Sequence, residues 1–445
     1  MGNKKINWSV IQPLNGGMPI GFEWELGEPK YIVSNNNGND TYYLDYVKQR
    51  NLNSKIIKMD WDLKEYFEED SDISKEEFEK QKEVDIVCAV PVCAGLSMLN
   101  AQKACTDKEC DMGRGNPNNV QNQNMYNVTR FVLNNIKPKV YVFENAPTAY
   151  TKLGQGVIEK LKQITKEAGY SVTVEKVNTI NHGIPQKRER TFVYFFKGPN
   201  AYLLNLEHQE TPDILSFFKK WIDKDATLQD EYVREKADIR DPAWLYIEEK
   251  VAKPQGKTVF EIAIELEGDK ITSSMKVIEK LNAFNELYDF IDDLIAKETD
   301  NEDEEEIKKL KKFKDKTKFI ENKLKMNKGY WDISNIFSTN GSHYNAFISK
   351  SAPFIIHPNG KRTLNKREML SLMGMPNDYE IKEEKAKFVS MLSQSVPTCT
   401  AQHAAKNCRL FVEGKLKKAS SNFVKQNNIK LKTDLGEPTL TEEEW

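Results

Sequence analysis

The sequence predicts a doubly wound α/β fold with a mostly parallel sheet and a second, smaller domain. Three observations support this prediction: short apolar runs alternate with amphipathic stretches over residues 1–198, the alternation is lost over 199–360, and apolar periodicity resumes over 361–412. Alternating strands and helices are typical of a parallel sheet covered by helices. Ligands of such sheets bind outside the carboxyl ends of the strands, so we expect the functional residues in the loops there.

Six apolar runs have the length and composition of buried strands. They are WSVI at Trp8, KYIV near Tyr31, KIIKM near Ile56, DIVCAV at Asp85, KVYVFE near Val140 and RTFVYFF at Arg190. The stretches between them predict helices. Residues 125–136 carry an apolar stripe that stops before Pro138. Residues 157–170 carry a second stripe, and we expect Gly169 to cap that helix.

The composition describes a folded chain with a polar surface. Hydrophobic residues make up 39% of the 445 residues and charged residues 30%, which suits a buried core. Lys and Arg total 65 against 67 Asp and Glu, a net charge of −2, so any nucleic-acid contact requires a local basic surface. The sequence has no run of ~18 apolar residues and no signal-peptide pattern. We therefore expect a cytoplasmic protein with no membrane partner.

The six cysteines are too sparse for a disulfide framework in a chain of this length. Their spacing allows a four-thiolate zinc site, formed by Cys88, Cys93, Cys105 and Cys110. Structural zinc sites favour turn-rich segments, whereas Cys88 lies in a strand-like run. We therefore expect no metal site.

One cysteine follows a predicted strand end. Cys93 comes after DIVCAV in a loop of Pro, Cys, Gly and Ser residues, where a thiolate can be exposed and the pKa of the thiol lowered. Cys93 is therefore a candidate nucleophile. A structural cysteine is the alternative.

Polar residues follow two further strands. Glu144 and Asn145 end the strand KVYVFEN, and burial there would raise the pKa of Glu144 and make it a general acid. A helix-capping or loop carboxylate is the alternative. Gln186, Arg188 and Arg190 alternate on one face of the next strand, as a row of anion ligands would. A surface salt-bridge ladder is the alternative for that row.

The variable segment carries opposite charges in sequence. Residues 298–306 are acidic, and lysines then occupy nearly every other position over 308–328. A solvated charged helix or connector is one interpretation, and a contact with the DNA backbone is the other.

The order and spacing of these groups resemble the DNA cytosine-5 methyltransferases. The order is the cysteine loop, the Glu-Asn-Pro strand end, the Gln-x-Arg-x-Arg strand, a long variable segment, and then RTLNKREMLSLMGMPNDY and SQSVPTCTA. The most specific piece matches the family pattern at Arg362, Leu364, Arg367, Glu368, Leu372, Gly374 and Pro376. The likeness extends from Trp8 to about Ala405 and implies a Rossmann-like class I methyltransferase fold.

The resemblance implies a division of the chain and a partner. Residues 1–198 would form the catalytic α/β domain, 199–360 the target-recognition domain, 361–412 a return to the catalytic domain, and 413–445 a C-terminal tail. The partner would be double-stranded DNA in a bacterial or phage-infected cell, with an unknown target sequence and oligomeric state. The target cytosine would be flipped out of the duplex.

The resemblance also assigns roles at the active site. Cys93 would add to C6 of the cytosine, Glu144 would hold and protonate N3, and Arg188 or Arg190 would hold the ring or the backbone. The methyl group would come from S-adenosylmethionine. Candidate substrate or DNA contacts are Asn145, Gln186, Ser97, Lys361 and Arg362, with His343, Tyr344 and Lys350 as further DNA-facing residues. Candidate cofactor residues are Asn15, Gly16, Gly17, Asn36, Asp60, Pro91, Gln394 and Ser395.

The chain departs from the family mainly on the cofactor side. Gln12 and Leu14 replace an aromatic residue and a glycine after the first strand, and Asn35 to Asn37 stand where an acid binds the ribose. Beside Cys93, Val92 replaces a proline. Three functions therefore stay open. They are a methyltransferase that uses S-adenosylmethionine through a rebuilt pocket, an enzyme with a different donor or C5 product, and a non-catalytic DNA-binding or regulatory homologue.

Overall fold

The computed structural model describes residues 5–34, 40–60, 66–67, 71–92, 95–96, 115–206, 208–221, 240–268, 270–330, 333–339, 342–347, 354–358 and 362–419. Several residues named above lie outside these ranges: Asn35, Asn36, Asn37, Cys93, Ser97, Cys105, Cys110, Lys350, Lys361 and residues 420–445 of the predicted tail.

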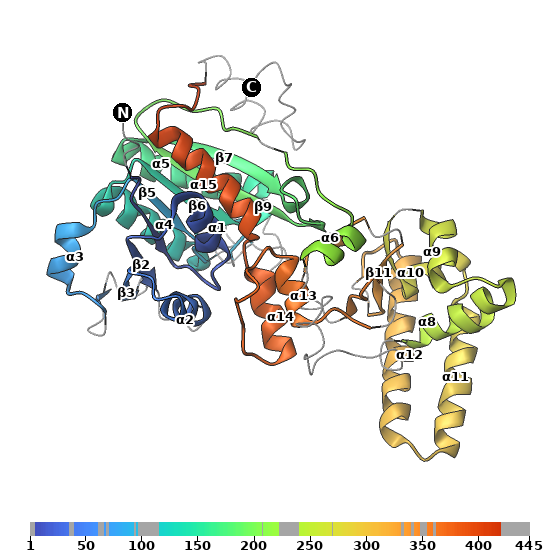
Figure 1. Cartoon of the computed structure of the whole chain (residues 1–445). Coiled ribbons are helices and arrows are strands. Elements are labelled where there is room, and N and C mark those ends of the chain that lie inside the picture. The colour runs from blue at the N-terminus through green and yellow to red at the C-terminus, as the bar shows by residue number, and fades with distance from the viewer. Residues whose placement is uncertain are drawn as a thin grey trace.

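An eight-stranded, mostly parallel sheet forms the centre of the larger part of the molecule (Figure 1). Its order is β4-β3-β2-β1-β5-β6-β9-β7. The strands are β1 (Trp8–Ile11), β2 (Tyr31–Ser34), β3 (Lys55–Asp60), β4 (Tyr66–Phe67), β5 (Ile86–Ala89), β6 (Val140–Asn145), β7 (Tyr170–Asn178) and β9 (Glu189–Lys197). Strand β9 runs antiparallel to β6 and β7, and β4 runs antiparallel to β3. The predicted doubly wound α/β fold is confirmed.

All six predicted strands are present, and the sequence analysis missed β4 and β7. Strand β7 has only three buried residues among nine, because it lies at the edge of the sheet. A half-exposed edge strand lacks the continuous apolar run that identified the others.

Helices cover both faces of the sheet, and strand side chains alternate between the two cores. Ile86 and Cys88 of β5 belong to one apolar cluster, while Val87 and Ala89 belong to the other. Helices α1 (Gly17–Leu26), α2 (Thr41–Gln49) and α15 (Thr398–Val412) pack in the first cluster. Helices α3 (Lys75–Gln81), α4 (Gln123–Phe131), its π-helical continuation η2 (Val132–Ile136) and α5 (Gln155–Ala168) pack in the second. Gly169 caps α5 in the left-handed conformation, as predicted.

Short elements connect these layers. Four single turns of helix are η1 (Val120–Asn122), η3 (Pro147–Tyr150), η4 (Lys152–Gly154) and η5 (Thr179–Asn181). Helix α6 (Ile214–Trp221) buries Ile214 and Phe217 in the first core, so the chain still packs with the sheet beyond residue 198. Helices α13 (Lys366–Ser371) and α14 (Lys385–Gln394) precede α15, and β8 (Gln186–Lys187) pairs with β12 (Tyr344–Asn345).

A mainly helical unit with its own apolar core lies beside the sheet (Figure 1). Its buried residues extend from Ala243 to Phe337, with Ile356 added. Its elements are α8 (Pro242–Tyr246), η6 (Ile247–Ala252), η7 (Lys253–Gln255), α9 (Val259–Glu267), β10 (Ile271–Ser273), α10 (Ser274–Leu281), α11 (Phe284–Asp300), α12 (Glu304–Lys325) and β11 (Ile336–Ser338). Acidic residues 298–306 span the turn between α11 and α12, and the lysine-rich segment forms α12. In the described part of the chain, no helix is long and apolar enough to span a membrane.

Candidate active site

Glu144 ends strand β6 at the carboxyl edge of the sheet, where its carboxylate meets an arginine. The distance from Arg190 Nε to Glu144 Oε1 is 2.6 Å, and the two side chains are only 14% and 5% exposed. The strand register explains this ion pair. Glu144 of β6 and Glu175 of β7 both pair with Phe192 of β9, which lies two residues from Arg190. The sequence analysis therefore named two residues that the structure brings together.

Burial controls the protonation of Glu144. Loss of hydration raises the pKa of the Glu144 carboxyl, and the positive charges of Arg190 and Arg188 oppose that rise. The net direction is upward. A buried carboxyl with a raised pKa keeps its proton at a higher pH than an exposed one does, which suits a group that delivers a proton.

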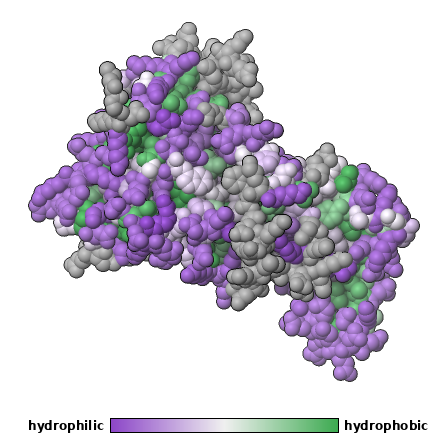
Figure 2. All heavy atoms as spheres, viewed as in Figure 1, coloured by the Kyte–Doolittle hydropathy of each residue, from purple (hydrophilic) through white to green (hydrophobic). Residues whose placement is uncertain are grey.

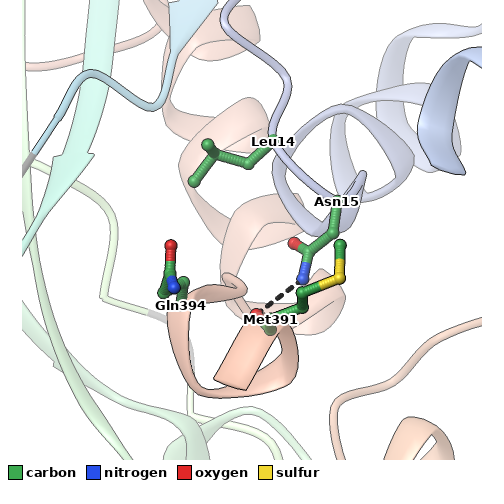
Figure 3. A pocket seen from close by; sticks show the side chains of 4 residues that line it. All are labelled: Leu14, Asn15, Met391 and Gln394. Carbon is green, nitrogen blue, oxygen red and sulfur yellow. Dashed lines mark hydrogen bonds between the residues drawn. The ribbon is translucent and has the colours of Figure 1, made fainter. Parts of the chain in front are cut away.

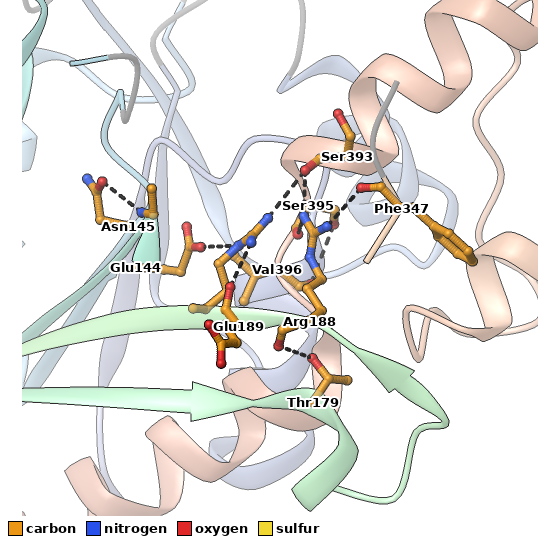
Figure 4. A network of polar contacts seen from close by, with 11 residues as sticks. Glu144, Asn145, Thr179, Arg188, Glu189, Phe347, Ser393, Ser395 and Val396 are labelled. Atoms are coloured by element: carbon orange, nitrogen blue, oxygen red, sulfur yellow. Dashed lines mark hydrogen bonds and ion pairs between the residues drawn. The ribbon is translucent and has the colours of Figure 1, made fainter. Parts of the chain in front are cut away.

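Arg188 is tethered to the backbone instead of facing a ligand (Figure 4). Its guanidinium, 1% exposed, donates hydrogen bonds to the carbonyl oxygens of Phe347 (3.1 Å), Ser393 (2.5 Å) and Ser395 (2.8 Å). We predicted that Arg188 contacts the substrate. A guanidinium that already serves three carbonyls is committed to structure, and the geometry favours a positioning role for this residue.

Three predicted DNA contacts also point into the protein. The Gln186 amide donates to the Leu372 carbonyl at 2.9 Å, and the Asn145 side-chain oxygen accepts from the Ala146 amide at 2.8 Å. Both side chains are fully buried. Arg362 forms a two-pronged ion pair with Glu368 at 2.6 and 2.8 Å. The sequence shows that these polar and charged residues alternate along the strand, but it does not show their partners. The acceptor of Gln186 lies 186 positions away, so it could not be predicted.

The loop that holds the candidate nucleophile begins beside Glu144. Ala89 of β5 pairs with Phe143 of β6, so the chain after Ala89 starts next to the end of β6. Pro91 is buried, and the Val92 amide donates to the Asn124 side chain at 3.3 Å. Cys93 itself lies outside the described residues, so its role stays a prediction. Cys88 is buried inside β5, and none of the residues that the structure describes forms a group able to hold a metal ion.

The turn after β1 packs against the segment before α15. Gly16 adopts a φ of +87°, and a Cβ on Gly17 would lie 1.9 Å from the Val396 carbonyl oxygen and 2.7 Å from Ser395 Oγ. Close packing therefore requires glycine at position 17 without any ligand. Of the predicted cofactor residues, Gly16, Gly17 and Ser395 do come together, although the two glycines have a structural reason of their own.

A recess opens between the same two segments, lined by Leu14, Asn15, Met391 and Gln394 (Figure 3). The Asn15 amide nitrogen donates to the Met391 carbonyl at 2.8 Å, whereas the Asn15 oxygen has no hydrogen-bond partner among the described residues. The recess is shallow and open to solvent, and its enclosed space is about 0 Å³, whereas a typical small-molecule pocket has ~300 Å³ or more. Asn15 and Gln394, both predicted from the sequence, share this site.

Comparison with known proteins decides the family. The profile of C-5 cytosine-specific DNA methylases matches residues 53–409, which is most of the chain. The chain belongs to this family. Its fold also resembles that of a solved prophage-encoded protein from E. coli, described as a DNA modification methyltransferase, with a TM-score of 0.52, 14% identity and coverage of 92% and 99% of the two chains.

Curated methylases of the family share modest identity with the chain. A type II methyltransferase of Bacillus paralicheniformis is 22% identical over 353 residues, which cover 72% of this chain and 69% of that protein. Type II methyltransferases of Haemophilus parahaemolyticus and Fusobacterium nucleatum are 27% and 26% identical over 128 and 197 residues. Those matches span 34% and 47% of the two relatives and 29% and 44% of this chain.

The residues around the recess fit one polar end of the family's cofactor. Within the described part of the chain, Asn15 offers a buried oxygen without a partner, and both amide atoms of Gln12 are also buried without a partner. Gln12 lies three residues before Asn15 and outside the recess lining. Buried polar atoms of this kind favour a ligand that supplies the missing hydrogen bonds. The described residues do not enclose enough volume for a whole nucleoside cofactor. Asp60 ends strand β3, two strands from β1 in the sheet.

The structure also contains a buried polar cluster that the sequence analysis missed. Glu175 of β7 accepts from Tyr194 at 2.7 Å and pairs with His403 of α15 at 2.8 Å. The His182 ring stacks on the His403 ring with centroids 4.7 Å apart. Burial lowers the pKa of His182 to about 3. The histidines are 221 positions apart, so only the fold reveals the cluster.

Proposed function

We propose that this protein is a DNA cytosine-5 methyltransferase that acts on a cytosine flipped out of duplex DNA. The observation that carries the proposal is the buried Glu144 carboxyl, held by Arg190 at the carboxyl end of β6. The segment that leads to Cys93 begins beside it. An acid and a candidate nucleophile on adjacent strand ends suit covalent chemistry on a pyrimidine ring.

In the proposed reaction, Cys93 Sγ adds to C6 of the cytosine while Glu144 delivers a proton to N3. The added electron density reaches C5, which would form a bond to the methyl carbon as the bond between that carbon and the donor's sulfur breaks and the thioether leaves. Loss of the C5 proton to solvent then breaks the C6–S bond and releases the cysteine thiolate. N3 returns its proton to Glu144, and the aromatic ring is restored. General acid catalysis of this kind typically contributes about 10²- to 10⁴-fold. Glu144 has the raised pKa that this role requires.

Arg190 and Arg188 take different parts in the proposal. Arg190 orients the Glu144 carboxyl through a direct ion pair. Arg188 acts as a positioning residue, because its hydrogen bonds join the start of β9 to the backbone at Ser393 and Ser395, on either side of Gln394. Arg188 thereby connects both the proposed base site and the wall of the recess to strand β9.

S-adenosylmethionine would supply the methyl group when bound. The residues that would hold it are Asn15, Gly16, Gly17, Asn36, Asp60, Pro91, Gln394 and Ser395. Asn15 would contribute its free oxygen, and Gly17 would allow the turn to approach residues 395–396 closely. The N-terminus of α1 would favour the anionic end of the ligand.

The helical unit is the proposed target-recognition part, within the predicted 199–360 segment. It has its own core. The chain that leaves it contains strand β12, which pairs with strand β8 at Gln186. It would hold double-stranded DNA while the cytosine leaves the stack, a step that costs a few kcal/mol. In this proposal, residues 361–412 would return to the catalytic part and 413–445 would be the C-terminal tail.

One observation favours a second candidate, a C5-modifying enzyme with a different donor. Gln12 and Leu14, at the positions where the family resemblance expects an aromatic residue and a glycine, both have positive φ, +53° and +49°. The Gln12 amide is buried without a partner among the described residues. In this candidate a polar group of the different donor satisfies that amide, so Gln12→Leu would leave the affinity for S-adenosylmethionine unchanged, whereas in the first candidate it would weaken it.

A duplex that contains 5-fluorocytosine tests the shared covalent step, because fluorine at C5 blocks the final elimination. With S-adenosylmethionine present, we expect a denaturant-stable adduct that is absent in Cys93→Ser and strongly slowed in Glu144→Gln. An adduct that requires a different donor would support the second candidate. DNA binding without any adduct would overturn both.

A further inference from the structure

Helix α12 carries four exposed lysines on the side away from its buried stripe. The helix packs against α11, and its buried residues are Leu310, Thr317 and Ile320. With 3.6 residues per turn, these buried positions leave the other side facing solvent. The exposed lysines there, which we call the lysine face, are Lys308, Lys311, Lys312 and Lys318. The exposed Lys316 lies at the border of this face, one turn before Ile320.

Other lysines of the same helix are paired, which makes the contrast informative. Lys309 meets Glu305 and Glu306, Lys314 meets Asp292, and Lys325 meets Glu321. Within the described ranges, no carboxylate forms an ion pair with a residue of the lysine face. Only one acid, Asp315, lies between Lys308 and Lys318.

The lysine face is unfavourable for the helix itself. Lys308 and Lys312, and Lys312 and the bordering Lys316, are four residues apart, a spacing at which like charges repel. The packing of α12 needs only its apolar stripe. A concentrated positive surface of this kind gains stability from a polyanion.

We propose that the lysine face grips the phosphate backbone of the duplex, away from the flipped base. In Figure 1, α12 lies on the side of the hairpin nearer the sheet, and α11 lies on the far side. The lysine face is turned away from α11, because the buried residues of α12 lie on its other side. The visible surface of the hairpin is mostly hydrophilic (Figure 2). This inference rests on the proposed function for its partner.

The dimensions suit a few phosphate contacts. The ten helical steps from Lys308 to Lys318 rise about 15 Å. Phosphates along one strand of a duplex are about 3.4 Å apart along the axis, so two to four of them lie within reach. Such contacts position the duplex without reading its sequence.

The test uses the full-length chain with Lys308→Gln, Lys311→Gln, Lys312→Gln and Lys318→Gln combined. Affinity for a 30-base-pair duplex is measured between about 50 and 200 mM salt. We expect at least tenfold weaker binding, and a logarithmic salt dependence flatter by about 2 to 3, because each lost phosphate contact removes about 0.9. The loss should be equal for unrelated duplex sequences.

Two matched controls keep the result specific. The same four positions changed to arginine should keep both the affinity and the salt dependence. Lys309→Gln with Lys325→Gln removes charges of the same helix that already have partners, and it should change the salt dependence much less. Thermal unfolding of all variants confirms that the helical unit stays folded.

Unchanged salt dependence in the four-glutamine variant would overturn the inference, as would an equal loss in the Lys309/Lys325 control. The exposed Phe319, 57% accessible beside these lysines, allows a different outcome. Binding to vesicles of anionic lipid that disappears in the variant, with DNA binding intact, would also overturn it. A weaker DNA affinity of the variant, together with a wild type that never forms an adduct with 5-fluorocytosine DNA, would support the backbone contact. The same result would contradict the proposed function.

Discussion

The two sides of the sheet's carboxyl edge differ in how their polar groups are paired. On the base side the charged groups have partners, because Glu144 meets Arg190 and Arg188 binds three carbonyls. The neutral Gln186 oxygen on that side is buried without a partner among the described residues. On the cofactor side, the Gln12 amide and the Asn15 oxygen find no partner within the same ranges. The difference indicates that the charged groups of the base side are organised in advance, whereas the cofactor side is completed by a ligand.

The largest expected effect is on the base side, from Arg188→Met. Loss of the guanidinium leaves the carbonyls of Phe347, Ser393 and Ser395 without this donor, at about 1–3 kcal/mol for each buried unsatisfied group. We expect the free energy of unfolding to fall by about 3–5 kcal/mol in denaturant titrations. Arg130→Met, at an exposed arginine, is the control and should change it by less than about 0.5 kcal/mol. Similar losses in both variants would contradict the positioning role.

Gly17→Ala tests whether the glycine turn is structural. The added Cβ would lie 1.9 Å from the Val396 carbonyl, and such overpacking typically costs about 1–3 kcal/mol. We expect a lower melting temperature without any cofactor present. Gly329→Ala, where a Cβ meets no atom within 4 Å, should be nearly neutral. Full stability of Gly17→Ala, with only cofactor binding lost, would assign the glycine to the ligand instead.

The buried histidine cluster predicts that the stability of the protein depends on pH. His182 has a pKa of about 3 in the folded protein and about 6.5 when unfolded. Between these values the unfolded chain binds the extra proton, so stability falls as pH drops below about 6.5, by up to about 1.4 kcal/mol per pH unit. His182→Gln should flatten the stability profile between pH 6 and 4, measured by denaturation at each pH. An identical slope in the variant, or the same flattening in the exposed His208→Gln, would rule out this assignment.

The smallest expected effect is on the cofactor side, from Gln12→Leu. Removing a buried amide without a partner should leave the free protein equally stable or more stable, by about 1 kcal/mol. Calorimetry should show weaker binding of S-adenosylmethionine, by roughly tenfold for one lost hydrogen bond. A marked loss of stability without ligand would mean that the amide already has a structural role, and the comparison of the two sides would fail.

Much of the architecture follows from local patterns in the sequence. The strands with continuous apolar runs, β1, β2, β3, β5, β6 and β9, are all predicted, because burial on both faces leaves a strong signal. Edge strand β7 lacks that signal, since most of its residues are only partly buried. The lysine-rich segment forms the charged helix α12, and this helix suits both interpretations, a solvated connector and the proposed contact with the DNA backbone.

The candidate site was harder to predict because its contacts join distant segments. Glu144 and Arg190 could be named from their strand positions. The direction of Arg188 and Gln186 could not, because their acceptors lie on segments from Phe347 to Ser395. The packing role of Gly17 depends on Val396 in the same way. Alternation along a strand shows which residues share a face, but not what that face contacts.

The most direct test of the account is mass spectrometry of cytosine nucleosides in DNA from cells that express the protein. We predict 5-methylcytosine with the wild-type chain, none with Cys93→Ser and much less with Glu144→Gln at equal protein levels. Another C5-substituted cytosine would contradict the proposed donor while keeping the covalent step. Unmodified cytosine with folded, DNA-binding wild-type protein would contradict the central claim.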